Sequence, residues 1–449
     1  MDDKIIAELT QFATSIKDFI NDGRAKGSFL PEEQEYQQWK LDNFEYIDSG
    51  VKSSGAQGKT LIRKTWLRAR ISVEKYFCDS KECKELQETL KNTFPEFHLD
   101  YLYRFIGKVV DQCFNENELN SRTVENIIGI FIKDLKQEPV KCDAEVELAG
   151  IVLKNKMIKI RGGIIIRQTE ITDLEKEISL RFEMKRFREY PSAILLMESY
   201  DRNPNDLQRK MVKAITILRL FKPGSIRYLT CKLSSESIAG LMGGTLYPGG
   251  DNHVLDTCLI QENEVEKLKK FWGGIENHIP DSLTGHDGGK TDYHHIAYNR
   301  YEDSLMKNGT IERRIANAIM GLEGIFLRGG EIQELSYRLS FRVARLMSIF
   351  GIEPMELRKA ISDSYQVRNQ FVHGGLLSYD KKNELEEKYG ELKNLLFKVL
   401  DSLRISIVNS LMINVSKDEL IDIIDKSFID DGHWEKLKTI TSQSRDVLI

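Results

Sequence analysis

The chain has 449 residues, of which 41% are hydrophobic and 30% are charged, and its formal net charge is −4. This composition is typical of a globular protein with apolar residues for several cores, and the length predicts about two to four domains. A chain that is slightly acidic overall is not a polycation, so any contact with nucleic acid has to come from local basic surfaces.

The sequence gives no indication of export or of a membrane anchor. Residues 1–6 are acidic and are not a basic segment followed by an apolar one, so we expect no secretory signal. No stretch approaches the roughly 18 uninterrupted apolar residues of a membrane span. The six cysteines are sparse and form no CxxC pair, which favours reduced thiols in a cytoplasmic protein.

Residues 1–138 are predicted to be a mostly helical N-terminal region. Apolar residues recur there at near-helical spacing, as in Leu102, Phe105 and Val109. The Gly- and Ser-rich residues 48–58 are predicted to be a loop. Residues 55–60 resemble part of a phosphate-binding loop, but Ser53 replaces the first glycine of that pattern, so a loop that opens a helix is the better prediction.

From residue 139 the pattern changes to that of an α+β domain, predicted over 139–275. The β-rich segments are separated by turn residues, and they cover 145–153, 157–160, 163–167 and 192–198. A helix is expected over 206–221, where Pro223-Gly224 would stop it. Residues 276–302 contain several glycines and polar residues and are predicted to be a linker or surface loop.

The helical pattern is strongest over 303–449, where we predict a helical bundle. Apolar stripes mark four helices, at 311–326, 335–350, 357–371 and 385–403. Glycines follow the first three of them, as expected where a helix ends in a left-handed residue. Four antiparallel helices with short connections form a bundle, and a short helix over 417–427 would pack on its end. The chain is therefore predicted to be multidomain and mainly α.

The third of these helices ends in residues 368–373, Arg-Asn-Gln-Phe-Val-His. Arg368 supplies a permanently charged planar fork that suits phosphate, and His373 supplies the side chain that titrates near neutral pH. Asn369 lies four residues before His373, so on a helix it would neighbour the imidazole and orient it. The two glycines that follow should end the helix and place His373 at the negative end of its dipole.

Arg368 and His373 do not share one face of a helix. They are five positions apart, which is about 140° around the helix axis. Two such helices that cross at a twofold axis would bring two arginines and two histidines into one cleft. The spacing therefore favours a site that belongs to a homodimer.

Residues 299–378 resemble the HEPN domains of the ApeA-like group. The hallmark of that family, an arginine, usually a polar residue, a short spacer and a histidine, is complete here, with Asn369 in the polar position. The matching segments are 314–318 leading to Leu322-Glu323, 334–338 with 342–344, and 365–374. Residues 218–224 look like the region that often precedes such domains.

This resemblance implies a cytoplasmic, metal-independent endoribonuclease that acts as a homodimer and needs no cofactor. Such enzymes serve in phage defence or as toxins, so the partners would be RNA, with tRNA as one candidate, and a phage-derived trigger sensed by residues 1–275. An RNA 2′-OH would attack the adjacent phosphate. His373 would be the general base or acid, Arg368 would stabilise the charge on the phosphate, and Asn369 would position His373 or a phosphate oxygen.

Other interpretations remain open at this point. Arg368 alone would be read as a salt-bridged surface residue and His373 as a helix cap. The whole module would then be a non-catalytic HEPN scaffold that dimerises, with residues 1–275 binding a partner or nucleic acid. Adjacent histidines such as His294 and His295 point apart, and no thiolate has metal-ligand spacing, so no metal site is predicted.

Two basic stretches are candidate RNA-binding surfaces. The first, expected on one helix, contains Arg63, Lys64 and Arg68, and the second contains Arg209, Lys210 and Lys213. Either stretch would follow an RNA backbone through its phosphates. Basic helical faces are more often simply solvated, which is the alternative for both.

Overall fold

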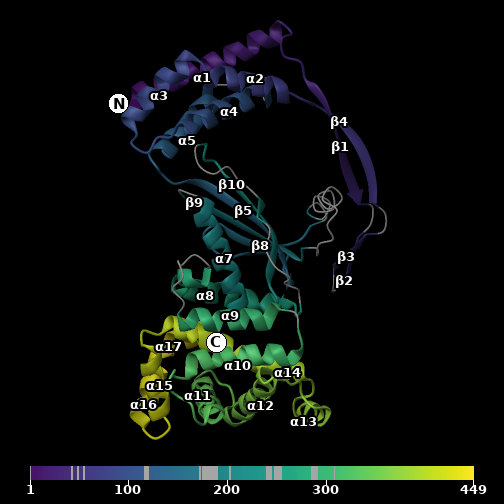
Figure 1. The fold of residues 1–449 in the computed structure, drawn as a ribbon, viewed down its shortest axis with the longest axis vertical. Helices are drawn as coiled ribbons and strands as arrows, with labels where there is room; N and C mark the ends of the chain where they lie inside the picture. Colours follow the sequence, from purple (N-terminus) through teal and green to yellow (C-terminus); the bar gives the residue numbers. More distant parts are fainter. Residues whose placement is uncertain are drawn as a thin grey trace.

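The computed structural model describes residues 2–41, 44–47, 50–53, 56–115, 121–170, 173, 191–201, 204–238, 245–246, 255–284, 292–307 and 309–449. The protein is mainly helical, with a small antiparallel sheet in the middle. Figure 1 shows the N-terminal helices at one end of the long axis, the sheet between, and the C-terminal helices at the other end. Within the described residues, no helix is long and apolar enough to cross a membrane.

The N-terminal helices have a core of their own. They are α1 (Asp2–Ala25), α2 (Leu67–Cys78), α3 (Lys81–Thr93), α4 (Leu99–Asn115) and α5 (Ser121–Leu135). Leu102, Phe105 and Val109 are fully buried on one side of α4, as their helical spacing predicts. Their cluster also includes Ile238, which follows the sheet.

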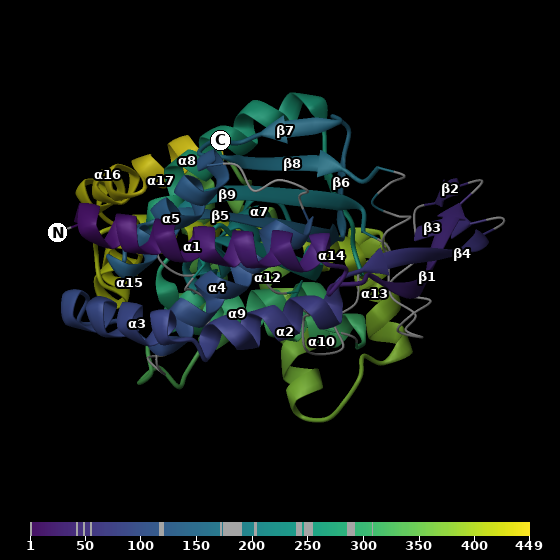
Figure 2. The ribbon, with the colours of Figure 1, turned by 90° about the horizontal axis from the view of Figure 1, so that it is seen from above.

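The prediction of helix is wrong for residues 32–41, 44–47 and 59–65, which form strands. β1 (Glu32–Leu41) pairs antiparallel with β4 (Ala56–Thr65), and β2 (Phe44–Ile47) pairs with β3 (Gly50–Ser53). The predicted loop over 48–58 therefore contains β3 and the start of β4. The reason is that pairing with a distant strand decides this backbone, and the partner strand lies outside any helical window. Figures 1 and 2 both show this hairpin to one side of the sheet.

The middle region is the α+β unit that the sequence predicts. Its sheet has the order β11-β10-β5-β9-β8-β7, with antiparallel neighbours. The strands are β5 (Val140–Ala149), β7 (Met157–Lys159), β8 (Ile164–Gln168), β9 (Ala193–Asp201), β10 (Arg227–Ser235) and β11 (Thr245–Leu246). β6 (Ile151–Leu153) pairs in parallel with β12 (Cys258–Ile260). The predicted helix before Pro223 is α7 (Pro204–Phe221), which packs on β5, β9 and β10 and on α8 (Val265–Ile275).

The C-terminal region consists of packed helices. They are α9 (Tyr293–Met306), α10 (Ile311–Phe326), α11 (Leu335–Ile349), α12 (Pro354–Val372), α13 (Tyr379–Tyr389), α14 (Leu392–Met412), α15 (Lys417–Lys426), α16 (Asp431–Ile440) and α17 (Ser442–Leu448). α10 lies at the centre, where it packs against α9, α12 and α14. The predicted helices over 311–326, 335–350, 357–371 and 417–427 correspond to α10, α11, α12 and α15.

Two predictions for this region are wrong. The expected linker 276–302 contains short 3-10 turns and most of α9, whose N-terminus Asp292 caps by accepting from the His295 amide. Its buried face includes Tyr298 and Tyr301. Because these aromatic residues carry polar hydroxyls, the spacing of apolar residues did not predict this helix. The expected long fourth helix is two helices, because Gly390 takes a left-handed φ of 83° between α13 and α14.

The middle and C-terminal regions share one continuous core, whose members run from Val140 to Leu437. Buried charged groups cross between the two regions. Arg219 of α7 donates to the Ile226 carbonyl at 2.7 Å and pairs with Glu302 of α9. Asp256 pairs with Arg314 of α10 at 2.5 Å. The pKa of Asp256 is lowered although burial opposes this, because two cations hydrogen-bond it.

Candidate functional site

Helix α12 carries the Arg-Asn-Gln-Phe-Val-His segment at its C-terminal end, as predicted. The helix begins at Pro354, where the Glu353 side chain accepts from the next backbone amides. It ends at His373, whose backbone N–H donates to the Asn369 carbonyl at 3.1 Å. Gly374 follows with a left-handed φ of 82°, which a glycine adopts without strain.

Arg368 is held in place by residues of two helices. Its Nη2 lies 3.1 Å from Glu323 Oε2 of α10, and its Nη1 donates to Asn369 Oδ1 at 3.2 Å. The centre of its guanidinium group lies 5.5 Å from the centre of the Tyr365 ring. Its Nε is buried and has no hydrogen-bond partner among the described residues. Arg368 is therefore positioned by the protein without being saturated by it.

Glu323 connects Arg368 to Tyr365. Burial of the Tyr365 hydroxyl, followed by the negative charge of the same carboxylate, raises the pKa of Tyr365. Reasoning from the sequence did not identify Glu323 or Tyr365 as site residues. No spacing links position 323 to position 368, and only the packing of α10 against α12 brings them together.

His373 is exposed at the end of α12. Its ring makes no hydrogen bond or ion pair with any residue that the structure describes. The helical spacing predicts that the Asn369 side chain orients the His373 ring. Its amide oxygen Oδ1 instead accepts from Arg368. In a single chain, Asn369 thus orients the arginine and leaves the imidazole free to meet a substrate.

Apolar side chains are exposed around the same helix end. Val372, Leu376 and Tyr379 have exposed fractions of 49%, 61% and 78%. Large apolar side chains that gather on a surface mark a contact with another molecule more often than isolated ones do. This end of α12 therefore presents an accessible imidazole together with exposed apolar side chains.

The first basic stretch is divided between two elements, so the single basic helix that we predicted does not exist. Arg63 and Lys64 lie on β4, whereas Arg68 lies on α2. The Arg68 side chain is exposed, and its Nε lies 3.3 Å from Glu32 Oε1. Lys59 and Thr60, which resembled a phosphate-binding loop, are also on β4 and do not open a helix, while Gly55 lies outside the described residues.

The second basic stretch lies on α7, but acidic residues compensate two of its three members. Arg209 lies 3.7 Å from Asp206, and Lys210 donates to Asp201 at 2.7 Å. Lys213 is half-buried, which lowers the pKa of its ammonium group. No described contact joins this stretch to the first one. The two stretches do not form one basic track.

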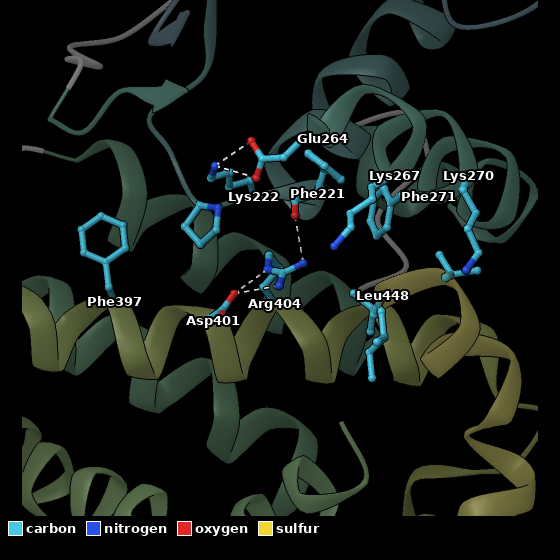
Figure 3. Close-up of a pocket in the computed structure, with 13 residues that line it drawn as sticks. Phe221, Lys222, Glu264, Lys267, Lys270, Phe271, Phe397, Asp401, Arg404 and Leu448 are labelled. Carbon is cyan, nitrogen blue, oxygen red and sulfur yellow. Dashed lines mark hydrogen bonds and ion pairs between the residues drawn. The ribbon is translucent and has the colours of Figure 1, made fainter. Parts of the chain in front are cut away.

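A further cleft lies where α7, α8 and α14 meet, and Figure 3 shows its charged side chains. Lys222 donates to both Glu264 oxygens and to the Leu259 carbonyl at 2.9–3.0 Å. Arg404 binds Asp401 and donates to the last carbonyls of α7, those of Leu220 and Phe221, at 3.0 Å. Lys222 and Arg404 are committed to protein acceptors, whereas Lys267 and Lys270, which also line this cleft, have no hydrogen-bond or ion-pair partner among the described residues.

The histidine pair at the start of α9 is also used by the fold. His294 Nε2 lies 3.2 Å from the Ser410 carbonyl, and His295 Nδ1 lies 2.8 Å from the Ser282 carbonyl. Within the described part of the chain, no group of three or more His, Cys, Asp or Glu side chains is arranged to hold a metal ion. His286 and Asp287 lie outside the described residues.

Comparison of the chain with protein-family models, with curated proteins and with solved structures finds no match. The functional interpretation therefore depends on the residues themselves and on the resemblance carried by residues 299–378.

Proposed function

We propose that this protein is a metal-independent endoribonuclease of the HEPN type, acting as a homodimer. The observation that carries the proposal is the end of α12, where a positioned but unsaturated Arg368 and an accessible, unpartnered His373 belong to one short segment. A fixed guanidinium suits a phosphate that gains charge. An imidazole free of protein partners suits proton transfer near neutral pH.

The reaction would transfer a phosphoryl group within the RNA. The 2′-oxygen attacks the neighbouring phosphorus, and the bond from phosphorus to the 5′-oxygen of the next nucleotide breaks. One His373 accepts the proton of the 2′-OH, and the His373 of the second copy donates a proton to the leaving 5′-oxygen. Arg368 stabilises the charge on the phosphoryl oxygens. The products are a 2′,3′-cyclic phosphate and a 5′-hydroxyl.

Two copies would meet through the exposed apolar residues at the end of α12. Arg368 and His373 lie about 140° apart on the helix, so one chain does not aim both at one phosphate. A twofold contact through Val372, Leu376 and Tyr379 would pool two copies of each. Residues 1–275 would then keep the site silent until a trigger acts, in a phage-defence or toxin role.

The proposal is tested with total RNA and purified tRNA in EDTA. We expect wild type to release fragments with cyclic phosphate ends, and His373→Ala to be slower by about 10²- to 10⁴-fold. Leu376→Asp, which places a charge in the apolar surface, should weaken both dimerisation in light scattering and cleavage. His433→Ala, at a half-buried histidine of α16, is the matched control and should cleave as wild type does. Equal cleavage by wild type and His373→Ala would refute the proposed role.

A non-catalytic HEPN scaffold is the second candidate, and one observation favours it. Glu323 compensates the charge of Arg368 inside a single chain, as in an ordinary structural ion pair. A scaffold would keep its biological activity in His373→Ala and lose it in Leu376→Asp. If the wild-type protein is toxic on expression and His373→Ala relieves that toxicity, the scaffold interpretation is ruled out.

A further inference from the structure

A cleft of about 720 Å³ lies between α11, α12 and α13. Tyr337 of α11, Arg358 and Tyr365 of α12 and Lys388 of α13 line it. Glu334, which directly precedes α11, also lines the cleft and has a left-handed φ of 53°. A positive φ is strained in a residue other than glycine, and residues with such strain are found often at functional sites.

The cleft contains an exposed aromatic platform. The Tyr337 ring is 59% exposed, and its centre lies 4.3 Å from the centre of the Phe341 ring. The Arg358 guanidinium lies 4.5 Å from the same Phe341 ring. An accessible tyrosine beside a stacked guanidinium is suited to hold the flat face of a base.

The cations that line the cleft differ in whether they already have acidic partners in the protein. Lys388 binds Asp363, which also accepts from Tyr389, so this lysine and this acid are committed to each other. Arg358 and Lys359 have no ion-pair or hydrogen-bond partner among the described residues. Their N–H groups remain available to an incoming anion, and a guanidinium or ammonium binds phosphate well.

Part of the α12 wall of the cleft lies on the same side of that helix as Asn369 and His373. Arg358, Ser362, Tyr365, Asn369 and His373 follow one another at intervals of three or four residues. At about 100° per residue they fall within roughly 80° of one another around the axis. The stripe is about 22 Å long at 1.5 Å per residue. Its central member, Tyr365, lies beside Arg368, whose guanidinium centre is 5.5 Å from the centre of the Tyr365 ring.

We infer that this cleft binds a nucleotide of single-stranded RNA next to the cleavage position. Its base stacks on Tyr337, and its phosphate binds Arg358 and Lys359. The strand then follows the stripe of α12 to Asn369 and His373. This inference rests on the proposed function, because it takes RNA as the substrate of the same site. It adds that the substrate is unpaired there, since a base inside a duplex has no free face to stack.

The test separates binding from cleavage by using His373→Ala as the parent protein. Fluorescence anisotropy measures its binding of a labelled single-stranded RNA of about 12 nucleotides, a length typical of single-strand sites. Tyr337→Ala in this background should weaken binding by roughly 5- to 100-fold, as loss of a stacked base does. Tyr200→Ala removes a tyrosine that is 66% exposed on β9, a strand that Figure 1 shows apart from α11, α12 and α13, and should leave binding unchanged.

Arg358→Gln should weaken binding and should also reduce its dependence on salt. One phosphate contact fewer lowers the slope of log affinity against log salt by about 0.7 for a single strand. In a cleaving background, Tyr337→Ala should raise KM with little change in kcat, because it does not touch the reacting atoms. A duplex of the same sequence should bind more weakly than the single strand.

The failures of the two proposals are distinguishable. If wild type cleaves RNA while Tyr337→Ala and Arg358→Gln bind it as tightly as their parent, the cleft is excluded and the ribonuclease stands. If the parent binds single-stranded RNA through Tyr337 but wild type never cleaves it, the cleft stands and catalysis is excluded. If the parent binds no RNA, or prefers the duplex, the inference is overturned.

Discussion

Arg342 of α11 and Arg368 of α12 lie on neighbouring helices and each contacts a glutamate, but the protein uses them differently. Arg342 is 2% exposed. Its five N–H groups all have acceptors at 2.7–2.8 Å, from Glu331, Asp425 and the Phe326 carbonyl. Arg368 donates from Nη2 to Glu323 and from Nη1 to Asn369, whereas its Nε has no acceptor among the described residues.

The comparison teaches how to separate a structural arginine from one that awaits a ligand. A guanidinium whose N–H groups are all satisfied gains nothing from a phosphate and would lose its existing bonds. A buried N–H without a partner costs free energy, which a bound anion could recover. Arg342 ties α11 to α15, whereas Arg368 retains donors for a substrate.

The largest expected effect is a loss of stability when Arg342, the arginine with all its N–H groups bonded, is removed. Arg342→Ala should lower the free energy of unfolding by about 3–5 kcal/mol, because it removes the buried guanidinium that Glu331 and Asp425 share. Arg338→Ala is the control, since Arg338 pairs with the same Glu331 at 3.1 Å but is exposed, and it should cost less than about 1 kcal/mol. Urea unfolding followed by circular dichroism measures both. Equal losses would mean that saturation of the guanidinium does not matter.

The next effect concerns the functional side. Arg368→Ala should reduce RNA cleavage by about 10²- to 10³-fold, as loss of one stabilising donor does, and should lower the free energy of unfolding by less than about 2 kcal/mol. Arg368→Lys keeps the charge but not the planar fork, so its cleavage rate should lie between those of wild type and Arg368→Ala. A loss of stability as large as that of Arg342→Ala would make Arg368 a structural residue.

A smaller effect follows from the pKa of Glu331, which hydrogen bonds from Arg342, among other contacts, lower from 4.5 to about 2. The unfolded chain binds a proton at higher pH than the folded protein does. The stability contributed by this carboxylate is therefore complete above pH 4.5 and is lost as the pH falls toward 2. The difference in unfolding free energy between wild type and Glu331→Gln should shrink across this window in urea titrations. A constant difference would contradict the assignment.

The smallest effects are expected at the compensated basic residues on the surface. Arg68→Gln and Arg209→Gln should each change the free energy of unfolding by less than about 0.5 kcal/mol, since exposed ion pairs contribute little. RNA binding should change by less than about twofold for each, because neither stretch forms a continuous track. A tenfold loss at Arg209 would restore the α7 face as an RNA-binding surface.

Part of the fold could be predicted because some elements carry their own periodic signal. α4, α10 and α11 bury one apolar stripe each, and β5 alternates buried and half-buried residues. The hairpin over 32–65 could not be predicted in this way, because pairing with a distant strand decides it. α9 was missed because its buried face includes Tyr298, Tyr301 and Ser304, and the hydroxyls of the two tyrosines bond across to α7.

The sequence by itself determined where α12 ends and which groups stand there, because Pro354, Gly374 and the helical repeat between them act locally. Only the tertiary structure decided what each group touches. The partners of Arg368 come from α10, and the cleft beside Arg358 needs α11 and α13. The spacing of residues along the sequence predicts only which side chains share one face of a single helix. Charge compensation and free donors depend on which helices pack together, and that is set by the shared core.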